Sequence, residues 1–149
     1  MKRTDSNLLH GSRGQSLVEF ALILPMILVV MFMITEFGRA LYQYNVLETA
    51  TRMGVRAAVV TNAGQAVATA EAQMDSILIA SRIPLNSVTK TVTIEANFGG
   101  DPTVTIVRAK ATKPFNWAFN GPITMQGNGQ VAKKTLTLTA ESLMKSETF

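Results

Sequence analysis

The residues that most often carry out chemistry in proteins are scarce and scattered in this sequence. It contains no cysteine and a single histidine, His10. Beyond residue 14 the only aspartates are Asp75 and Asp101, which stand apart in the chain. A metal site or an acid–base pair needs clustered ligands or titratable groups, and no nucleophile motif supports serine or lysine chemistry. We therefore expect no enzyme activity, no metal site and no cofactor.

One titratable residue, Glu19, occupies an unusual position. It stands at the start of an apolar run, and residues 20–35 contain no charge. A carboxylate at the middle of a membrane costs about 3 kcal/mol, and less toward an end, so Glu19 calls for a partner. The alternative is that its side chain extends to the lipid headgroups, as side chains near helix ends often do.

The apolar run is long enough to cross a membrane. With residues 15–18 it supplies about the 20 residues that a helix needs to span ~30 Å of hydrocarbon. It is apolar on all sides, which argues against a helix in a soluble core. A cleaved secretory signal is a further alternative, but residues 35–39 read TEFGR and offer no small-residue cleavage site. We predict a transmembrane helix over residues 15–35.

The charges before this run predict its orientation. Lys2, Arg3 and Arg13 precede the apolar residues. The positive-inside bias therefore places the leader, residues 1–14, in the cytoplasm and the remainder of the chain outside.

The residues around Glu19 resemble a known processing pattern. Gly14 is followed by QSLV, then by Glu19 and Phe20, then by ALILP ending at Pro25, and later by EFGR at 36–39. This is similar to the TadE-like family, the pseudopilins of tight-adherence (Flp) type IV pilus systems, over about the first third of the chain. Ordinary type IV pilins are less similar, because their first mature residue is usually Phe and here it is Gln15.

The resemblance implies a processing event and a set of partners. A prepilin peptidase would cut between Gly14 and Gln15, which places the glutamate at the fifth mature position, and Glu19, Phe20 and Pro25 would serve assembly and recognition. The implied partners are that peptidase, other pilin and pseudopilin subunits in a homo- or hetero-oligomer, and the inner-membrane assembly platform with its secretion ATPase. Major pilins of the family are much shorter, so this chain resembles a minor subunit, held in the bacterial inner membrane or also incorporated in an extracellular pilus.

Cleavage at this site has a physical rationale. It would create an α-amine on Gln15 with a reference pKa of about 7.7 to 8.0, largely protonated at neutral pH. Glu19 lies about 6 Å further along a helix. In a bundle of staggered copies Glu19 could meet the new amine of a neighbour, which pairs two charges that are each costly in lipid. Gly14 lacks a Cβ and lets a protease approach the backbone closely.

Pro25 has two interpretations. It has no N–H and leaves the carbonyl of Ala21 without its helical partner, which loosens or kinks the helix. Membrane helices tolerate such a kink for packing. The alternative is a yielding point that lets the helix bend or stretch in a filament.

Length and net charge limit the number of domains and the kinds of partner that the chain can have. The 149 residues suffice for one modest domain and a membrane segment. Removal of residues 1–14 takes away three basic residues and one acidic residue, which lowers the net charge from +4 to +2. The longest basic cluster beyond the leader, Lys133–Lys134, is interpreted as the solvated face of a strand, so we expect no nucleic-acid partner. Without disulfides, stability must come from packing or from partner subunits.

Residues 36–61 are predicted to be an amphipathic continuation of the helix. Glu48 and Arg52 have a favourable i, i+4 spacing, and 62–64 supplies turn residues that end the helix. The expected apolar stripe consists of Phe37, Leu41, Tyr44, Leu47, Thr51, Val55 and Ala58.

Residues 62–149 are predicted to form an α+β domain outside the membrane. A second helix over 65–81, closed by Pro84, should pack on the outer half of the first. A period of two then predicts strands at 91–98 and from 104, joined by a turn at 99–102, and a last strand at 130–140. The expected fold class is α+β: a long N-terminal helix, a second helix and a small antiparallel sheet of about three strands.

Two segments remain open. Phe115, Trp117 and Phe119 either form an exposed contact for a partner or the membrane interface, or lie under the sheet as core, the interpretation we favour. The tail, residues 141–149, is predicted to be a fraying helix or disorder.

Two functional classes follow. The first is a pseudopilin or minor pilin subunit of a tight-adherence pilus. The second is a single-pass, membrane-anchored periplasmic binding module. Processing at Gly14 distinguishes them, while the lack of catalytic clusters disfavours an anchored enzyme.

Overall fold

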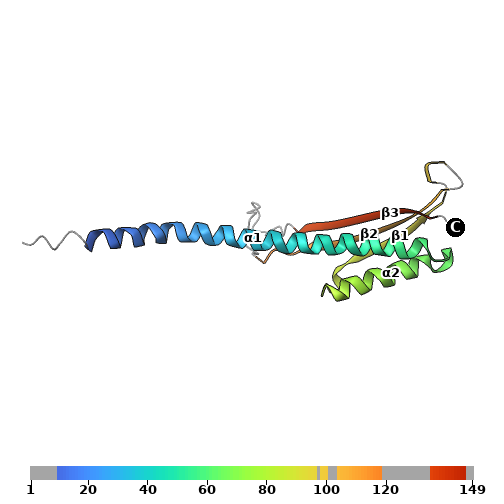
Figure 1. Ribbon diagram of the computed structural model, residues 1–149, viewed down its shortest axis with the longest axis horizontal. Helices are drawn as coiled ribbons and strands as arrows, with labels where there is room; N and C mark the ends of the chain where they lie inside the picture. Colours follow the sequence, from blue (N-terminus) through green and yellow to red (C-terminus); the bar gives the residue numbers. More distant parts are fainter. Residues whose placement is uncertain (1–9, 97, 101–103, 119–134, 147–149) are drawn as a thin grey trace, which may run out of the picture. The chain divides into compact units, whose positions relative to one another are not determined.

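The computed structural model describes residues 10–96, 98–100, 104–118 and 135–146. Two helices, α1 (His10–Val59) and α2 (Ala63–Ala80), precede three strands, β1 (Thr89–Glu95), β2 (Thr105–Phe115) and β3 (Leu136–Ser146). Short 3₁₀ turns lie at Leu85–Ser87 and Phe98–Gly100. The strands form one antiparallel sheet in the order β1-β2-β3 (Figure 1). The predicted α+β class and its long helix, second helix and three strands are confirmed.

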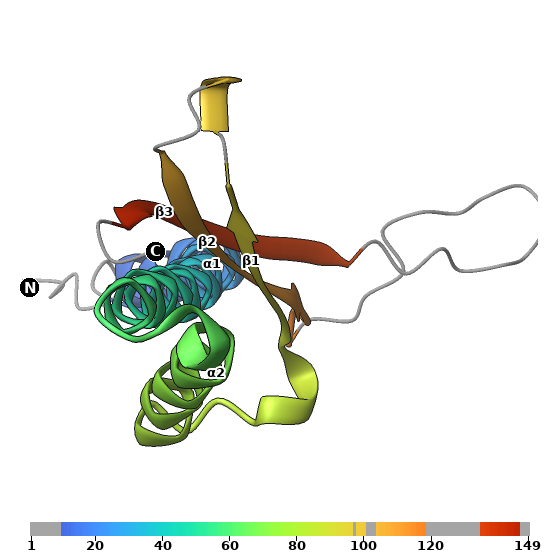
Figure 2. The ribbon, with the colours of Figure 1, turned by 90° about the vertical axis from the view of Figure 1, so that its right-hand side faces the viewer.

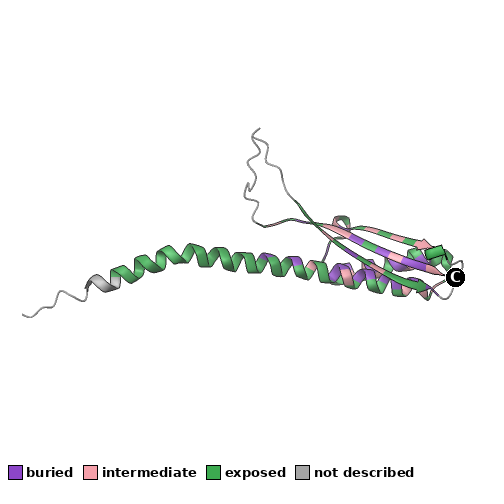
Figure 3. Ribbon diagram, turned by 90° about the horizontal axis from the view of Figure 1, so that it is seen from above, coloured by how far each residue is buried: buried purple, intermediate pink, exposed green. Residues whose placement is uncertain are grey.

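The chain divides into two compact units, residues 1–38 and 39–149. In the first unit α1 continues through Pro25 without a break in its helical assignment. Every described side chain from Gly14 to Thr35 is exposed, as the green part of α1 in Figure 3 shows. This helix is long and apolar enough to cross a membrane. Lipid or partner helices can therefore reach every side of it.

The second unit has its core between α1, α2 and the sheet. Figure 2 shows α2 and the sheet packed against different sides of α1. Leu47 and Val55 of α1, Met74 and Leu78 of α2, and Val107 of β2 are fully or almost fully buried. The prediction that the second helix packs on the outer half of the first is confirmed, because Gly54 of α1 contacts α2 closely.

The sheet follows the predicted period of two. Val107, Ala109 and Ala111 of β2 face the helices and are fully buried, while Arg108 and Lys110 point to the other face. The small alanines let the helices approach the sheet closely, and the alternating residues present charge to water.

The last strand corrects the sequence interpretation. Its predicted range was 130–140, but β3 runs over Leu136–Ser146, and the prediction of a fraying or disordered tail is wrong for 141–146. Adjacent Leu143 and Met144 break the local alternation, so the pattern alone stopped too early. Pairing decides the end, because the register with β2 continues from Phe115↔Leu136 to Thr105↔Ser146. Residues 130–134, including Lys133–Lys134, lie outside the described residues.

The first two strands also shift. The strand predicted at 91–98 begins at Thr89 and ends at Glu95, and Phe98 lies in a 3₁₀ turn where Gly99 and Gly100 have positive φ. Pro114 falls inside β2. β1 begins opposite Thr112, so Pro114 lies on a part of β2 that pairs only with β3.

The predicted apolar stripe of α1 is correct only in its second half. Leu47, Thr51, Val55 and Ala58 are buried, but Phe37, Leu41 and Tyr44 are exposed. Glu36 and Ala40 are buried instead. The buried face of α1 thus begins with a glutamate and an alanine, so it does not follow the apolar residues of the sequence there.

Candidate processing and assembly site

The predicted cleavage point lies inside α1. The helix begins at His10, so the bond between Gly14 and Gln15 is in its second turn. Among the described residues, a Cβ at position 14 would meet no atom within 4 Å, so packing against them does not require the glycine. A need for a glycine here must come from a partner, as expected for a site that a protease approaches.

Glu19 has a partner that the sequence interpretation missed. The side-chain Nε2 of Gln15 donates a hydrogen bond to Oε1 of Glu19 at 3.0 Å. The two residues are one helical turn apart, and both are exposed. The i, i+4 spacing of an amide and a carboxylate is the signal that could have revealed this bond.

This bond does not neutralise Glu19. A side-chain amide contributes a dipole and no charge, so this hydrogen bond supplies no counter-ion for a carboxylate at the start of an apolar helix. Two turns of α1 hold the first residues of the predicted processing pattern, as their spacing predicts: Gly14, Gln15, Glu19 and Phe20. Pro25 lies about 8 Å further along the helix axis than Phe20.

The aromatic segment belongs to the second unit and is anchored by an arginine. Phe115 is buried, which confirms the core interpretation for this residue, and its ring packs edge-on against Trp117 with centroids 5.2 Å apart. The Arg39 guanidinium lies 4.9 Å from the centre of the Phe115 ring, and its Nη2 donates to the carbonyl oxygen of Asn116 at 2.6 Å. Trp117 is half-buried. Phe119 lies outside the described residues.

Lys113 is a second basic residue near Arg39 and the aromatic segment. Its Nζ donates to Oε1 of Gln43 at 2.9 Å. Burial lowers the pKa of Lys113, and the nearby positive charge of Arg39 lowers it further. Sequence reasoning could not find this pair, because Arg39 and Lys113 are far apart in the chain.

The other face of the sheet carries an ion network. Arg108 pairs with Glu141 of β3 and with Glu95 of β1, the latter at 3.1 Å. The hydrogen bond to Glu141 is the main cause that raises the pKa of Arg108; burial opposes it, and the charge of Glu95 adds a smaller upward effect. The predicted i, i+4 ion pair between Glu48 and Arg52 is also present.

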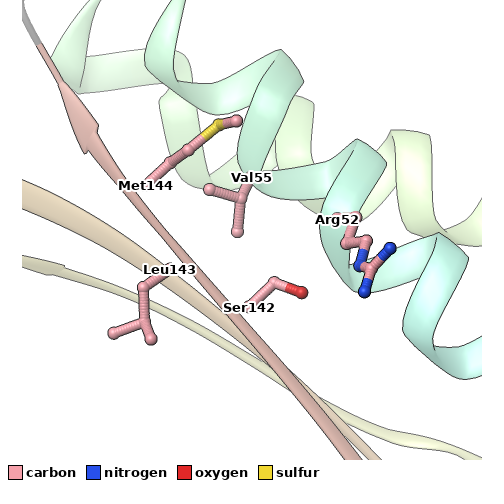
Figure 4. A pocket seen from close by; sticks show the side chains of 5 residues that line it. All are labelled: Arg52, Val55, Ser142, Leu143 and Met144. Atoms are coloured by element: carbon pink, nitrogen blue, oxygen red, sulfur yellow. The ribbon is translucent and has the colours of Figure 1, made fainter.

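An open pocket lies between α1 and β3. Figure 4 shows its lining, Arg52, Val55, Ser142, Leu143 and Met144. The hydroxyl of Ser142 lies 3.1 Å from that of Thr51. Among the residues that the structure describes, no group of three His, Cys, Asp or Glu side chains could hold a metal ion. The pocket is thus lined by the guanidinium of Arg52, the hydroxyl of Ser142 and three apolar side chains.

Comparison with known proteins identifies the first part of the chain. Residues 14–56 match the family model described as TadE-like protein. The match includes the predicted cleavage point, Glu19, Phe20 and Pro25, and it extends into the second unit. No curated protein and no solved structure matches the chain. The predicted resemblance to TadE-like proteins is confirmed over these residues.

Proposed function

We propose that this TadE-like chain is a pseudopilin, a minor subunit that takes part in the biogenesis of a tight-adherence (Flp-type) pilus. A prepilin peptidase removes residues 1–14, and the apolar part of α1 holds the mature chain in the bacterial inner membrane. The second unit lies on the periplasmic side. The partners are the peptidase, other pilin and pseudopilin subunits, and the assembly platform with its secretion ATPase.

The observation that carries the proposal is the pairing state of Glu19. In the described structure its one polar contact is the neutral amide of Gln15, on a helix whose neighbouring side chains are exposed and apolar. A carboxylate in that environment is stabilised by a cation. Cleavage after Gly14 supplies one, the α-amine of Gln15, on the next subunit of a staggered bundle.

The helical conformation around Gly14 adds a requirement to cleavage. Proteases bind their substrates in an extended form, so the first turns of α1 must unwind before the bond is cut. Glycine is less favourable in a helix than alanine by about 1 kcal/mol, which lowers the cost of this unwinding. Gly14 thus serves both the local opening of the helix and the close approach of the enzyme.

Mass spectrometry of the membrane-extracted chain tests the proposal. When the chain is produced with its matching prepilin peptidase, the N-terminus should be Gln15. Gly14→Leu should leave the precursor beginning at Met1, because it restores helix propensity and blocks the approach to the bond. The matched control is Gly38→Leu, a glycine of the same helix that also has open space around it, which should not affect cleavage. An intact precursor of the unchanged chain in the presence of the peptidase would contradict the proposal and favour a plain anchored binding module.

A further inference from the structure

The sheet has two outer edges that can accept another strand. In the described part of the chain, β1 and β3 pair only with β2. An open strand edge presents a row of backbone donors and acceptors that can pair with another chain. β3 is eleven residues long, so this edge is extensive.

The two edges carry opposite charges at positions that the strand registers align across the sheet; we call such an aligned set of residues a level. The register aligns Glu95 of β1 with Ile106 of β2, and Ile106 with Lys145 of β3. The β1 edge therefore carries a carboxylate at the level where the β3 edge carries an ammonium group. In the described structure Lys145 makes no ion pair, and it is exposed.

The faces toward the helices are complementary as well. One level further, Ile94 aligns with Val107 and then with Met144. Ile94 is half-buried, while the side chain of Met144 is 41% exposed beside the pocket at Val55. An isoleucine next to β3 at this level would lie beside Met144, one of the side chains that line that pocket (Figure 4).

The direction of the strands selects between two ways of pairing. β1 and β3 are both antiparallel to β2, so they run parallel to each other. Copies that stand side by side in the same direction therefore place β3 of one copy next to β1 of the next. The other option, β3 against β3 in antiparallel orientation, would turn the second copy around within the sheet.

Contacts within the second unit show how β3 is oriented relative to α1, and therefore where the start of the unit would lie in an antiparallel pair. Lys113, aligned with Leu138, bonds to Gln43, and Ser142 bonds to Thr51, so β3 runs in the same direction as residues 43–51 of α1. In an antiparallel pair the two Arg39 residues, where the chains enter this unit, would lie at opposite ends. Copies that share one membrane surface bring these entry points to the same end, which parallel pairing satisfies directly.

We propose that this chain associates with copies of itself by parallel strand addition, β3 of one copy against β1 of the next, in a continuous sheet. Lys145 then lies beside Glu95 of the neighbour, and Met144 beside its Ile94. The interface joins two different surfaces, so it extends into rings or open rows rather than closed pairs. The inference requires that copies share a membrane surface, and it does not depend on cleavage at Gly14.

Disulfide cross-linking in membranes tests the arrangement, because the chain has no native cysteine. Thr93 and Leu143 share a level through Arg108, and both are exposed. In neighbouring strands their Cα atoms would lie about 5 Å apart, within the range of a disulfide. Within one copy they are two strands apart, about 9 to 10 Å, which is too far for a disulfide.

Copies with Thr93→Cys and copies with Leu143→Cys are produced together and mildly oxidised. The expected product is the mixed dimer, and a chain with both substitutions should give a ladder of higher oligomers. Ile79→Cys, exposed on α2, replaces Thr93→Cys in the control for random collisions. Mixed dimers no more abundant than in this control would overturn the proposal, as would dimers formed chiefly between Leu143→Cys copies, which indicate antiparallel pairing.

Charge reversal provides a second measurement. Lys145→Glu in the Leu143→Cys copy should lower the mixed-dimer yield several-fold, since it faces Glu95 of the neighbour. Glu95→Lys in the Thr93→Cys copy should restore it. Arg82→Glu, the same reversal of charge at an exposed residue outside the sheet, is the matched control and should leave the yield unchanged. Equal yields for all these variants would contradict the proposed register, and the whole series is repeated in the uncleaved Gly14→Leu chain so that its outcome is independent of processing.

Discussion

Gly54 of α1 faces Met74 of α2 so closely that a Cβ on residue 54 would lie 2.7 Å from Cγ of the methionine. The same atom would lie 3.1 Å from the carbonyl oxygen of Ala70. The glycine thus sets the distance between the two helices of the second unit. Nothing in its local sequence, RMGVRAA, distinguishes it from an ordinary helix glycine.

Gly54→Ala should therefore destabilise the second unit although alanine favours helix. The overpacking cost of about 1 to 3 kcal/mol exceeds the helix-propensity gain of about 1 kcal/mol. Thermal unfolding of the detergent-extracted chain, followed by circular dichroism, should show a lower Tm. Gly64→Ala in α2, where a Cβ meets no atom within 4 Å, is the control and should leave Tm unchanged or slightly higher.

Glu19→Ala should separate membrane insertion from assembly. Removal of the charge makes membrane entry easier, so the variant should reach normal membrane levels and should still be cut. It should co-purify poorly with pilus or platform proteins, because the amine of Gln15 on a neighbour loses its partner. Glu19→Asp, shorter by one methylene, should be intermediate. Normal co-purification of Glu19→Ala would show that the carboxylate only extends to the headgroups.

Gln15→Ala distinguishes the hydrogen bond from the charge. It removes the 3.0 Å bond to Glu19 but leaves the α-amine of residue 15 after cleavage. We expect assembly close to normal, measured by the same co-purification at equal membrane levels. A loss as large as that of Glu19→Ala would assign the role of Glu19 to its contact within the chain.

The stability of the second unit should depend on pH through Lys113. Its pKa is lowered from 10.5 in the folded chain, by burial and then by Arg39, so the unfolded chain binds this proton more tightly. The resulting penalty is complete below the folded pKa and disappears as the pH rises through it to 10.5. Relative to Lys113→Gln, which removes this titration, the unchanged chain should gain stability toward pH 10 in denaturant unfolding. Arg39→Gln should reduce that gain, and a difference that stays flat with pH would contradict the assigned cause.

Phe115 and Arg39 should contribute unequally to stability. Phe115→Ala removes a fully buried ring and should cost about 3 to 5 kcal/mol. Arg39→Lys retains the charge but loses the planar group that lies over the ring, and should cost about 1 kcal/mol. Chemical denaturation of both variants checks this order.

The elements that the sequence predicts well are those with local signals. α2 was expected at 65–81 and lies at Ala63–Ala80, because alanine content, periodicity and the following Pro84 all act within a few residues. The connected pair β1 and β2 was found for the same reason. Gly14, Gln15 and Glu19 are neighbours on one helix, as their spacing predicts, while cleavage after Gly14 stays a prediction.

The elements that it predicts poorly depend on partners distant in the chain. The extent of β3 follows from its register with β2, and the buried ring of Phe115 lies against Arg39, which comes 76 residues earlier in the sequence. The exposed side of the apolar stripe, at Leu41 and Tyr44, depends on which face of α1 the sheet covers. No local period contains that information.

The contact between Arg39 and the end of β2 has a mechanical consequence. Arg39 is the first residue of the second unit, so tension applied through the anchor reaches this unit there. The guanidinium holds the Asn116 carbonyl and the Phe115 ring, at the end of the strand that pairs on both sides. Through this contact, a pull on Arg39 therefore acts on the end of the middle strand of the sheet, and not on an edge strand.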